Sequence, residues 1–328
     1  MSRLLIVVLG TAVLFAAQPP SSSGPGWIYW RTGNVTDVQK STAGGFVFEG
    51  GSTDVDAAYQ WMCKKANGGD FLVIRSSGSS DYNPYIYGLC PGINSVSTLK
   101  ILSRDGAQQP FVAETIRKAE VLFIAGGDQA NYVNHWLGTP VHDAIDELAA
   151  RGTPIGGTSA GDAILAEFSF SALHDTITSP QALANPFDDR VTLTNGFLRL
   201  NASLSRRITD THFAARDRMG RLLVFLARMA QTGEAAAIAT DEKTALLMEP
   251  DGRATVVGKG AVYFVQAPGK PEVCRPGTPL TYLNLSVYKI RQGAAFNVRT
   301  WSGTGGTAYS LSVQEGVVSS TQPGGAIY

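Results

Sequence analysis

The sequence lacks a net charge, a basic block, and any long hydrophobic run beyond its first residues. Its 328 residues contain 27 Lys and Arg residues against 27 Asp and Glu residues, so the formal net charge is zero. Without a basic block there is no electrostatic footprint for DNA or RNA, and we expect no nucleic-acid partner. Hydrophobic residues make up 44% and charged residues 16% of the chain. This balance is typical of a folded globular protein rather than a disordered one.

Cysteine is also scarce, with only Cys63, Cys90 and Cys274. None of them lies in a Cys-x-x-Cys pattern or beside a histidine at metal-ligand spacing, so we expect no metal site. Cys63 and Cys90 are the nearest pair in the sequence and flank a predicted strand–helix unit, which favours a disulfide between them. Three reduced, buried thiols are the alternative.

The hydrophobic run that is present follows Arg3 and covers residues 4–17. It is shorter than the ~20 residues needed to span a bilayer but suits the core of a signal peptide. We therefore assign residues 1–17 to a signal peptide and 18–40 to a leader and flexible spacer. The expected protein is secreted, extracellular or periplasmic, without stable membrane insertion. An uncleaved membrane anchor is the alternative.

Residues 41–268 show apolar strands alternating with helical segments. The expected strands cover 45–49, 71–75, 97–102 and 121–125, and the expected helices cover 54–65, 113–119 and 141–151. Continuous apolar strands of this kind predict a mostly parallel sheet covered on both faces, with ligand sites at the carboxyl ends of its strands. We assign 41–268 to a catalytic α/β domain. Short β-like pieces from about residue 236 suggest an antiparallel extension, and residues 269–328 a β-rich C-terminal extension ending in a loose tail.

Residues 157–161 read Gly-Thr-Ser-Ala-Gly and fit the pattern G-x-S-x-G. A β-run precedes the pattern and a helix-compatible segment, residues 162–167, follows it, which is the order of a nucleophile elbow. The glycines avoid a clash in a strained turn, and a helix amino end would favour an oxyanion. The pattern predicts that Ser159 is a nucleophile, and a glycine-rich turn with an idle serine is the alternative.

A nucleophilic serine needs a base and an orienting carboxylate. Among the four histidines, His212 is the best candidate because it stands at the entrance of a predicted helix between acidic and apolar neighbours. Asp241 and Glu242 both end a short β-run, where either could present a carboxylate to the imidazole.

Four segments together resemble the cyanophycinase and dipeptidase E family of serine peptidases, and look closest to its cyanophycinase branch. They are residues 125–129 (Ala-Gly-Gly-Asp-Gln), 156–161 (Gly-Gly-Thr-Ser-Ala-Gly), 210–213 (Asp-Thr-His-Phe) with the arginines that follow, and 240–245 (Thr-Asp-Glu-Lys-Thr-Ala). The resemblance implies a flavodoxin-like, three-layer α/β sandwich similar to class I glutamine amidotransferases. It also implies a catalytic triad of Ser159, His212 and Glu242.

The resemblance further implies an oxyanion hole made by the backbone N–H groups of Asp128 and Ala160. It assigns substrate contacts to five side chains: Gln129, Asp210, Arg216, Arg218 and Arg221. Such arginines can hold a carboxylate by paired hydrogen bonds, and an ion-paired helix face is their alternative role. Two departures leave the substrate open, because Thr211 replaces the usual glutamine and Asp162 stands where a small residue is usual.

These observations predict a serine-type exopeptidase that acts at aspartyl residues without a metal or organic cofactor. Its expected partner is a peptide or polymer rich in aspartyl residues, cleaved at aspartyl or β-aspartyl-arginine peptides, and a homodimer is left open. Two alternatives remain: a non-catalytic secreted binding protein on the same scaffold, and an α/β-hydrolase-type esterase. The esterase would place its acid between Ser159 and the last histidine.

Overall fold

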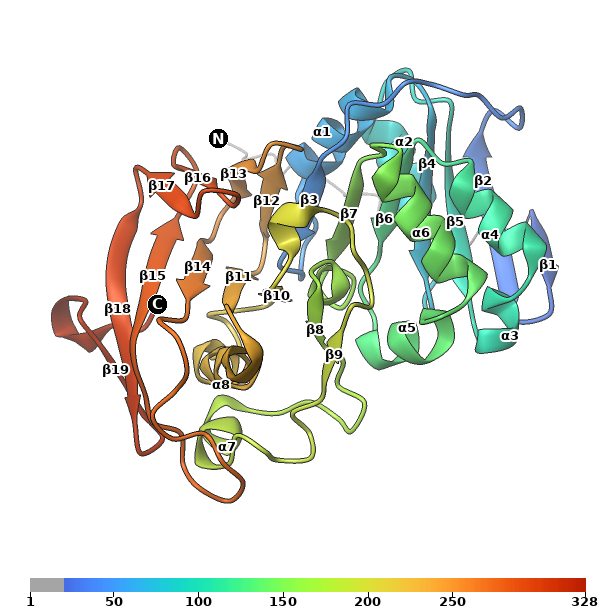
Figure 1. Cartoon of the computed structure of the whole chain (residues 1–328). Helices are drawn as coiled ribbons and strands as arrows, with labels where there is room; N and C mark the ends of the chain where they lie inside the picture. Colours follow the sequence, from blue (N-terminus) through green and yellow to red (C-terminus); the bar gives the residue numbers. More distant parts are fainter. Residues whose placement is uncertain (1–20) are drawn as a thin grey trace, which may run out of the picture.

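The computed structural model describes residues 21–328, and the expected signal peptide at 1–17 lies outside the described residues. Within the described part, no helix combines the length and the apolar character needed to cross a membrane. Two sheets, one of eleven and one of eight strands, form the frame of the molecule (Figure 1).

Five parallel strands form the centre of the larger sheet. In spatial order they are β5 (Ser95–Ile101), β4 (Asp70–Arg75), β6 (Val121–Ile124), β7 (Ile155–Thr158) and β3 (Phe46–Glu49). Nearly every residue in them is buried. The continuous apolar runs predicted such a doubly covered parallel sheet.

Helices cover both faces of this sheet (Figure 1). One face carries α1 (Asp56–Ala66) and α2 (Tyr82–Leu89), and the other carries α3 (Arg104–Ala107), α4 (Pro110–Arg117), α5 (Gln129–Trp136) and α6 (Pro140–Ala150). Alternate residues of β4 serve the two layers: Phe71 packs in the core with α1, and Leu72 in the core with α4 and α6. The structure therefore confirms the expected three-layer α/β sandwich.

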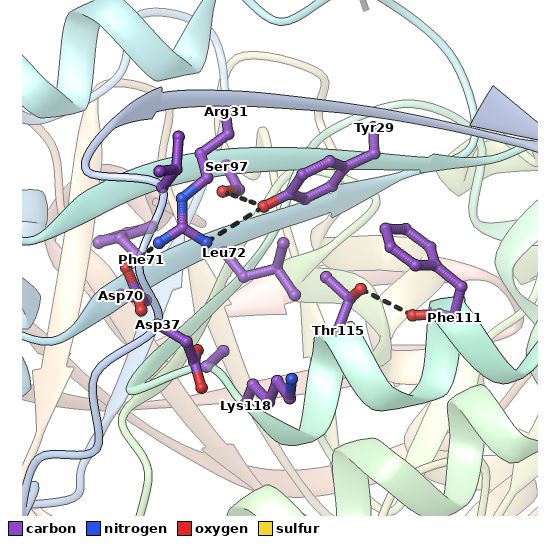
Figure 2. A pocket seen from close by; sticks show the side chains of 12 residues that line it. Tyr29, Arg31, Asp37, Asp70, Phe71, Leu72, Ser97, Phe111, Thr115 and Lys118 are labelled. Carbon is purple, nitrogen blue, oxygen red and sulfur yellow. Dashed lines mark hydrogen bonds and ion pairs between the residues drawn. The ribbon is translucent and has the colours of Figure 1, made fainter. Parts of the chain in front are cut away.

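One edge of the sheet corrects an expectation, because part of the predicted flexible spacer forms strands. β1 (Ser22–Gly24) pairs with β2 (Trp27–Gly33), and β2 runs antiparallel to β5. Trp27 is buried and stacks on Phe111 at a centroid distance of 4.3 Å. Figure 2 shows the same edge, where Arg31 is ion-paired with Asp70 at 2.9 Å. The ion pair holds β2 at the amino end of β4, and the stacked rings hold the start of β2 against α4.

The opposite edge is extended by antiparallel strands. β12 (Thr244–Met248) pairs with β3, and β13 (Arg253–Gly258), β16 (Ala295–Asn297) and β17 (Ser302–Thr304) follow in order. Two of these strands come from residues 269–328, so the C-terminal extension builds onto the same sheet as the α/β core.

The second sheet was not expected from the sequence. Its order is β19 (Val317–Ser320), β18 (Thr307–Gln314), β15 (Tyr282–Ile290), β14 (Val262–Gln266), β11 (Ala236–Thr240), β10 (Arg207–Asp210), β8 (Phe168–Phe170) and β9 (Leu193–Asn195). β10 runs parallel to both β8 and β11, whereas the other pairs are antiparallel. The expected antiparallel extension is therefore right for β12–β14 but wrong for the β10–β11 pair.

Two helices pack with this second sheet, α7 (Ser179–Ala184) and α8 (Met219–Met229), and nearly all of α8 is buried. The expected loose tail is wrong as well. β18 and β19 pair over four residues, and Tyr328 packs against Phe213 and Tyr263. Small polar residues fit these strands because one side of each faces solvent.

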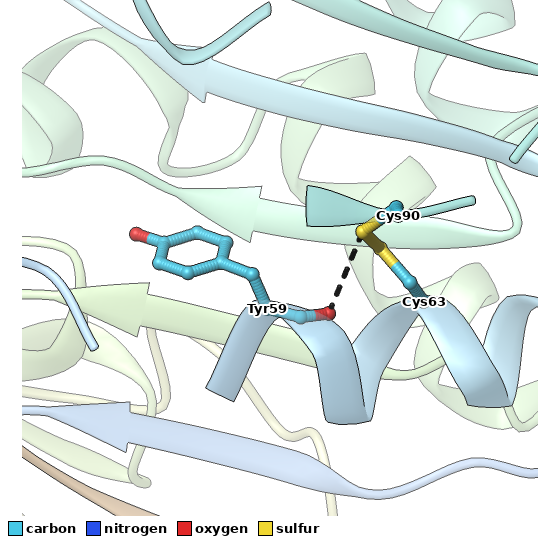
Figure 3. Close-up of a disulfide and its surroundings, with 3 residues drawn as sticks. All are labelled: Tyr59, Cys63 and Cys90. Atoms are coloured by element: carbon cyan, nitrogen blue, oxygen red, sulfur yellow. Dashed lines mark hydrogen bonds between the residues drawn. A yellow bond between two sulfur atoms is a disulfide. The ribbon is translucent and has the colours of Figure 1, made fainter. Parts of the chain in front are cut away.

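The structure contains a disulfide between Cys63 of α1 and Cys90, the residue that follows α2 (Figure 3). Their Cα atoms are 5.9 Å apart. The bridge ties together the two helices on one face of the larger sheet. Cys274 is a free, half-buried thiol.

Candidate active site

Ser159 follows β7 directly and sits at the carboxyl edge of the parallel sheet. Its φ is +54°, in the left-handed region, which costs a non-glycine residue about 1–3 kcal/mol. The neighbouring glycines make this turn feasible, because a Cβ on Gly157 would lie 2.5 Å from the Gly161 carbonyl carbon. A strained serine between glycines at a strand end has the geometry of a nucleophile elbow.

The helix expected after Ser159 is absent. Only a single 3-10 turn, Asp162–Ile164, follows, and the chain then enters β8 of the second sheet. Residues 162–167 cannot form a helix against the first sheet because they connect the two sheets. The helix start close to Ser159 belongs to α5 instead: a Cβ on Gly126, just before α5, would lie 3.4 Å from Ser159 Cβ.

The structure brings Ser159, His212 and Glu242 together. Ser159 Oγ lies 2.8 Å from His212 Nε2, and His212 Nδ1 lies 2.7 Å from Glu242 Oε1. His212 follows β10 and Glu242 follows β11. Because these two strands are parallel neighbours, their carboxyl ends deliver the imidazole and the carboxylate to the same place.

Asp241, the other candidate acid, has a structural role. One of its carboxylate oxygens accepts a hydrogen bond from the Ala214 N–H at 3.0 Å, and the other accepts one from the Ala261 N–H at 2.9 Å. Successive side chains of an extended segment point to opposite sides. Glu242 can therefore face His212 only while Asp241 faces away from it.

A glycine pair after β3, Gly50–Gly51, supports the triad and was not among the site residues predicted from the sequence. The His212 N–H donates to the Gly50 carbonyl at 2.8 Å, and the Lys243 N–H donates to the Gly51 carbonyl at 3.0 Å. Gly51 has φ +89°, and a Cβ there would lie 2.6 Å from His212 Nε2. The sequence did contain a signal for this contact: two glycines directly follow a buried strand, at the edge of the sheet where Ser159 was expected.

The electrostatics favour a neutral imidazole with its lone pair toward Ser159. Burial lowers the pKa of His212, and the positive charges of Arg216 and Arg218 lower it further, while the bond to Glu242 opposes them. The hydrogen bond from His212 lowers the pKa of Glu242, which keeps this carboxylate ionised. A neutral base next to an ionised acid is the arrangement needed for proton transfer from a serine hydroxyl.

The two residues expected to supply the N–H groups of an oxyanion hole belong to the two segments that meet at the serine. Ala160 follows it in the turn, and Asp128 follows the Gly126–Gly127 turn that passes beside it. Within residues 21–328, neither N–H donates to another protein group. The Asp128 side chain instead accepts a hydrogen bond from the Ala130 N–H at 2.9 Å and caps α5.

Two of the five expected substrate contacts, Asp210 and Arg221, form a buried ion pair. Arg221 Nε donates to Asp210 Oδ2 at 2.9 Å, and each side chain is only 3% exposed. The Arg221 guanidinium also lies over the Phe170 ring at 5.0 Å. Because β8 and α8 enclose this pair, neither side chain faces a substrate.

The other three expected contacts lie nearer to solvent. Arg216 is 53% exposed, and its Nε lies 3.9 Å from Glu242 Oε1. Arg218 donates to the Thr211 carbonyl at 2.8 Å, and burial lowers its pKa to about 10. Gln129 is half-buried and donates to the Phe170 carbonyl at 3.3 Å. Since α8 begins only at Met219, Arg216 and Arg218 precede the helix on which they were expected.

Two buried acids lie close to the nucleophile. Glu49 accepts hydrogen bonds from the Val55 N–H at 2.6 Å and the Tyr59 hydroxyl at 3.3 Å. Burial raises the pKa of Glu49 to about 8, and Asp54 adds to this effect. Burial also raises the pKa of Asp162, whose carboxyl has no partner among the described residues. Burial therefore disfavours the charged form of both carboxyl groups.

An acidic cavity of about 670 Å³ lies next to the Gly50–Gly51 turn that contacts His212. Its walls include Ser52, Asp54, Asp56, Arg75, Asp81, Tyr82 and Tyr85. Ser52 follows Gly51, which packs against His212, and Gly127 lies close to Ser77, at the end of β4. The cavity thus occupies the same carboxyl edge of the sheet as Ser159.

The polar groups of this cavity are partly engaged. Tyr82 donates to Asp54 at 3.3 Å and Tyr85 to Asp56 at 2.6 Å. Arg75 Nη1 donates to the Ser79 carbonyl at 3.0 Å. Three carboxylates against one arginine make the cavity suitable for a cation. Within residues 21–328, no group of three or more His, Cys, Asp and Glu side chains is placed to hold a metal ion.

Comparison with known proteins points to one family. The sequence model of peptidase family S51 matches residues 92–253, a range that includes Ser159, His212 and Glu242. The chain is 28% identical over 212 residues to a cyanophycinase of Trichormus variabilis, covering 63% of this chain and 66% of that protein. It is 25% identical over 252 residues to a cyanophycinase of Geminocystis herdmanii, covering 73% and 86%. The match therefore spans just under two thirds of the length of the first of these relatives.

The fold is shared with a solved structure of a peptidase from an acI-B1 actinobacterium. The TM-score is 0.54 at 18% sequence identity, and the match covers 79% of this chain and 98% of that chain. At this identity the likeness shows a common fold.

Proposed function

We propose that the chain is a serine peptidase of the S51 family, whose sequence model matches residues 92–253, with Ser159 as nucleophile, His212 as general base and Glu242 as orienting acid. The observation that carries this proposal is the continuous chain of hydrogen bonds, 2.8 and 2.7 Å long, that links the three side chains. The strained backbone at Ser159 adds support, since such strain is concentrated at functional sites.

The reaction follows from this arrangement. Ser159 Oγ attacks the carbonyl carbon of the peptide bond while its proton moves to His212 Nε2. The N–H groups of Asp128 and Ala160 stabilise the negative oxygen of the tetrahedral intermediate. His212 then gives the proton to the leaving amine as the C–N bond breaks. A water molecule, deprotonated by His212, attacks the acyl-enzyme and releases the carboxylic acid and the free serine.

The order of the three residues argues against the esterase alternative. In an α/β-hydrolase the chain order is serine, acid, histidine, whereas the carboxylate bonded to His212 is Glu242, which follows it. A purely binding role gives no reason for a neutral, desolvated imidazole held between an alcohol and a carboxylate.

We further propose that the substrate combines an aspartyl carboxylate with a basic side chain, as in aspartyl or β-aspartyl-arginine peptides. Both relatives are named cyanophycinases. Arg216 is exposed beside Glu242 and suits a substrate carboxylate, and Gln129 can both donate and accept hydrogen bonds. The acidic cavity with Tyr82 and Tyr85 suits a guanidinium, which pairs with carboxylates and stacks on aromatic rings.

The decisive experiment is mass spectrometry of the products formed from cyanophycin and from a panel of aspartyl peptides. Wild-type protein should release products cleaved next to aspartyl residues, and Ser159→Ala should fold with an unchanged melting temperature but form none. Ser169→Ala, which alters a buried serine in β8, is the matched control. Full activity of Ser159→Ala would refute the assignment of the nucleophile.

We also propose that the protein is exported. The Cys63–Cys90 disulfide supports this, because disulfides persist in oxidising compartments and are rare in the cytosol. Fractionation of the natural producer, with N-terminal sequencing of the mature chain, should find the protein outside the cytoplasm and starting after residue 17. Intact residues 1–17 on a cytoplasmic protein would contradict the proposal.

A further inference from the structure

Tyr328 packs against the segment that follows the catalytic histidine. Its ring meets Phe213 edge-on, with centroids 5.7 Å apart and an interplanar angle of 80°, and it meets Tyr263 in the same way at 6.0 Å. Phe213 is fully buried and comes directly after His212. The β-rich C-terminal extension thus reaches back to the site built by the α/β core.

The hydroxyl of Tyr328 makes two hydrogen bonds in this segment. It accepts one from the Met219 N–H at 2.9 Å and donates one to Asp217 Oδ1 at 2.8 Å. Met219 is the first residue of α8, and the preceding Arg218 provides no side-chain cap. The phenol therefore satisfies one of the N–H groups that a helix leaves unpaired at its start.

Asp217 occupies a sensitive position, because it lies between Arg216 and Arg218 in the sequence. Its backbone is held at φ +47°, its N–H donates to the Ala214 carbonyl at 3.1 Å, and its own carbonyl accepts a hydrogen bond from Ser179. Within residues 21–328, no ion pair joins its carboxylate to either arginine. The carboxylate is bonded instead to Tyr328, and among the described residues the exposed Arg216 guanidinium forms an ion pair only with Glu242, at 3.9 Å.

We propose that Tyr328 is a positioning residue: by holding the Asp217 carboxylate, it keeps Asp217 from pairing with Arg216, which can then bind the carboxylate of the substrate. The inference rests on the proposed function, since it takes Arg216 as a substrate contact. Without the phenol hydroxyl, the Asp217 carboxylate loses its donor and pairs with the neighbouring guanidinium. A substrate must then break that ion pair before it can bind Arg216.

The test measures binding without turnover. A β-aspartyl-arginine peptide is titrated by calorimetry into Ser159→Ala protein carrying further substitutions. Tyr328→Phe keeps the ring contacts but removes the hydroxyl, and should weaken binding roughly threefold to fivefold, the range expected for competition by an exposed ion pair. Tyr328→Phe/Asp217→Asn should restore the Kd to within about twofold of the parent, because asparagine has no charge to pair with arginine.

Two control variants separate positioning from general destabilisation. Asp217→Asn alone should bind like the parent. Tyr282→Phe removes another phenol hydrogen bond, to the Gly269 carbonyl at 2.6 Å, and should leave Kd unchanged. A purely structural role for Tyr328 would weaken binding equally in the single and the double variant, whereas the inference requires recovery in the double variant.

The outcomes also separate this inference from the proposed function. Turnover by wild-type protein together with an unchanged Kd in Tyr328→Phe, or with no recovery in the double variant, overturns the inference alone. The predicted Kd pattern in a protein whose wild type has no turnover overturns the proposed peptidase activity alone. No binding of the peptide to the Ser159→Ala parent overturns both the inference and the proposed substrate.

Discussion

Replacing Gly51 with alanine tests whether the approach of the Gly50–Gly51 turn to the imidazole is needed for catalysis. An alanine Cβ would lie 2.6 Å from both Nε2 and Cε1 of His212 and 3.0 Å from Ser159 Cβ. Ordinary contacts between such atoms are about 3.5–4.0 Å, so the ring must move by roughly 1 Å. A shift of this size lengthens the 2.8 Å bond between Ser159 Oγ and His212 Nε2 beyond hydrogen-bonding range.

The expected loss of activity follows from losing the base. General-base catalysis contributes about 10²–10⁴-fold to the rate, so kcat/KM on an aspartyl peptide should fall by at least ~10²-fold. Because Gly51 has φ +89°, alanine should also cost about 1–2 kcal/mol of stability through backbone strain. Steady-state kinetics and thermal unfolding of the purified variant measure the two effects separately.

A matched control isolates the contact from the strain. Gly152 has a similar φ of +80°, but nothing lies within 4 Å of the position that a Cβ would occupy. Gly152→Ala should therefore lose similar stability and retain wild-type kcat/KM. If Gly51→Ala retains kcat/KM within about threefold of wild type, the imidazole tolerates the added methyl group and the reasoning about this turn is wrong.

Three further predictions concern the acid, the base and the buried ion pair. Glu242→Gln should lower kcat by ~10²–10⁴-fold with little change in KM, because an amide neither stabilises the His212 imidazolium nor fixes the tautomer of the neutral ring. An unchanged kcat would exclude Glu242 from the triad. The pKa of His212 is lowered, so kcat/KM should stay constant as the pH falls past the usual histidine pKa of ~6.5. It should decrease only at lower pH, where the imidazole becomes protonated. A pH of half-maximal kcat/KM above ~6.5 would contradict this direction. Arg221→Met should lower the free energy of unfolding by about 3–5 kcal/mol in denaturant, because Asp210 stays buried without its partner. The double variant Arg221→Met/Asp210→Leu should recover most of that loss. An unchanged free energy of unfolding in Arg221→Met would show that the pair is dispensable.

Several parts of the site followed from short segments of sequence. The G-x-S-x-G pattern after a β-run placed Ser159 in a strained turn, because only glycine fits on both sides of such a turn. The apolar runs at 71–75 and 121–125 predicted buried parallel strands and hence the edge where the site lies. In contrast, the helix expected at 162–167 is absent, since the chain there crosses to a second sheet whose existence no local pattern indicated.

The roles of the charged residues were harder to predict because they depend on burial. Arg216 and Arg221 are the same residue type five positions apart, yet the first is half exposed beside Glu242 and the second is enclosed with Asp210. What separates them is the start of α8 between them and the packing of β8 over that helix. Likewise, the acidic cavity combines residues from the segments that follow β3 and β4. These strands are not neighbours in the sheet, but they run parallel, so both end at the same edge.

The amino-acid sequence by itself determined what depends on near neighbours: the alternation of strands and helices, the turn that carries Ser159, and the set of side chains available for catalysis. Backbone sterics and hydrophobic periodicity act over a few residues, so a reader of the sequence can work them out. Only the tertiary structure decided that Glu242 rather than Asp241 meets His212, that Asp210 and Arg221 are buried together, and that Tyr328 reaches the arginine segment. These outcomes depend on the pairing of strands and on desolvation by residues far away in the chain, which no local pattern specifies.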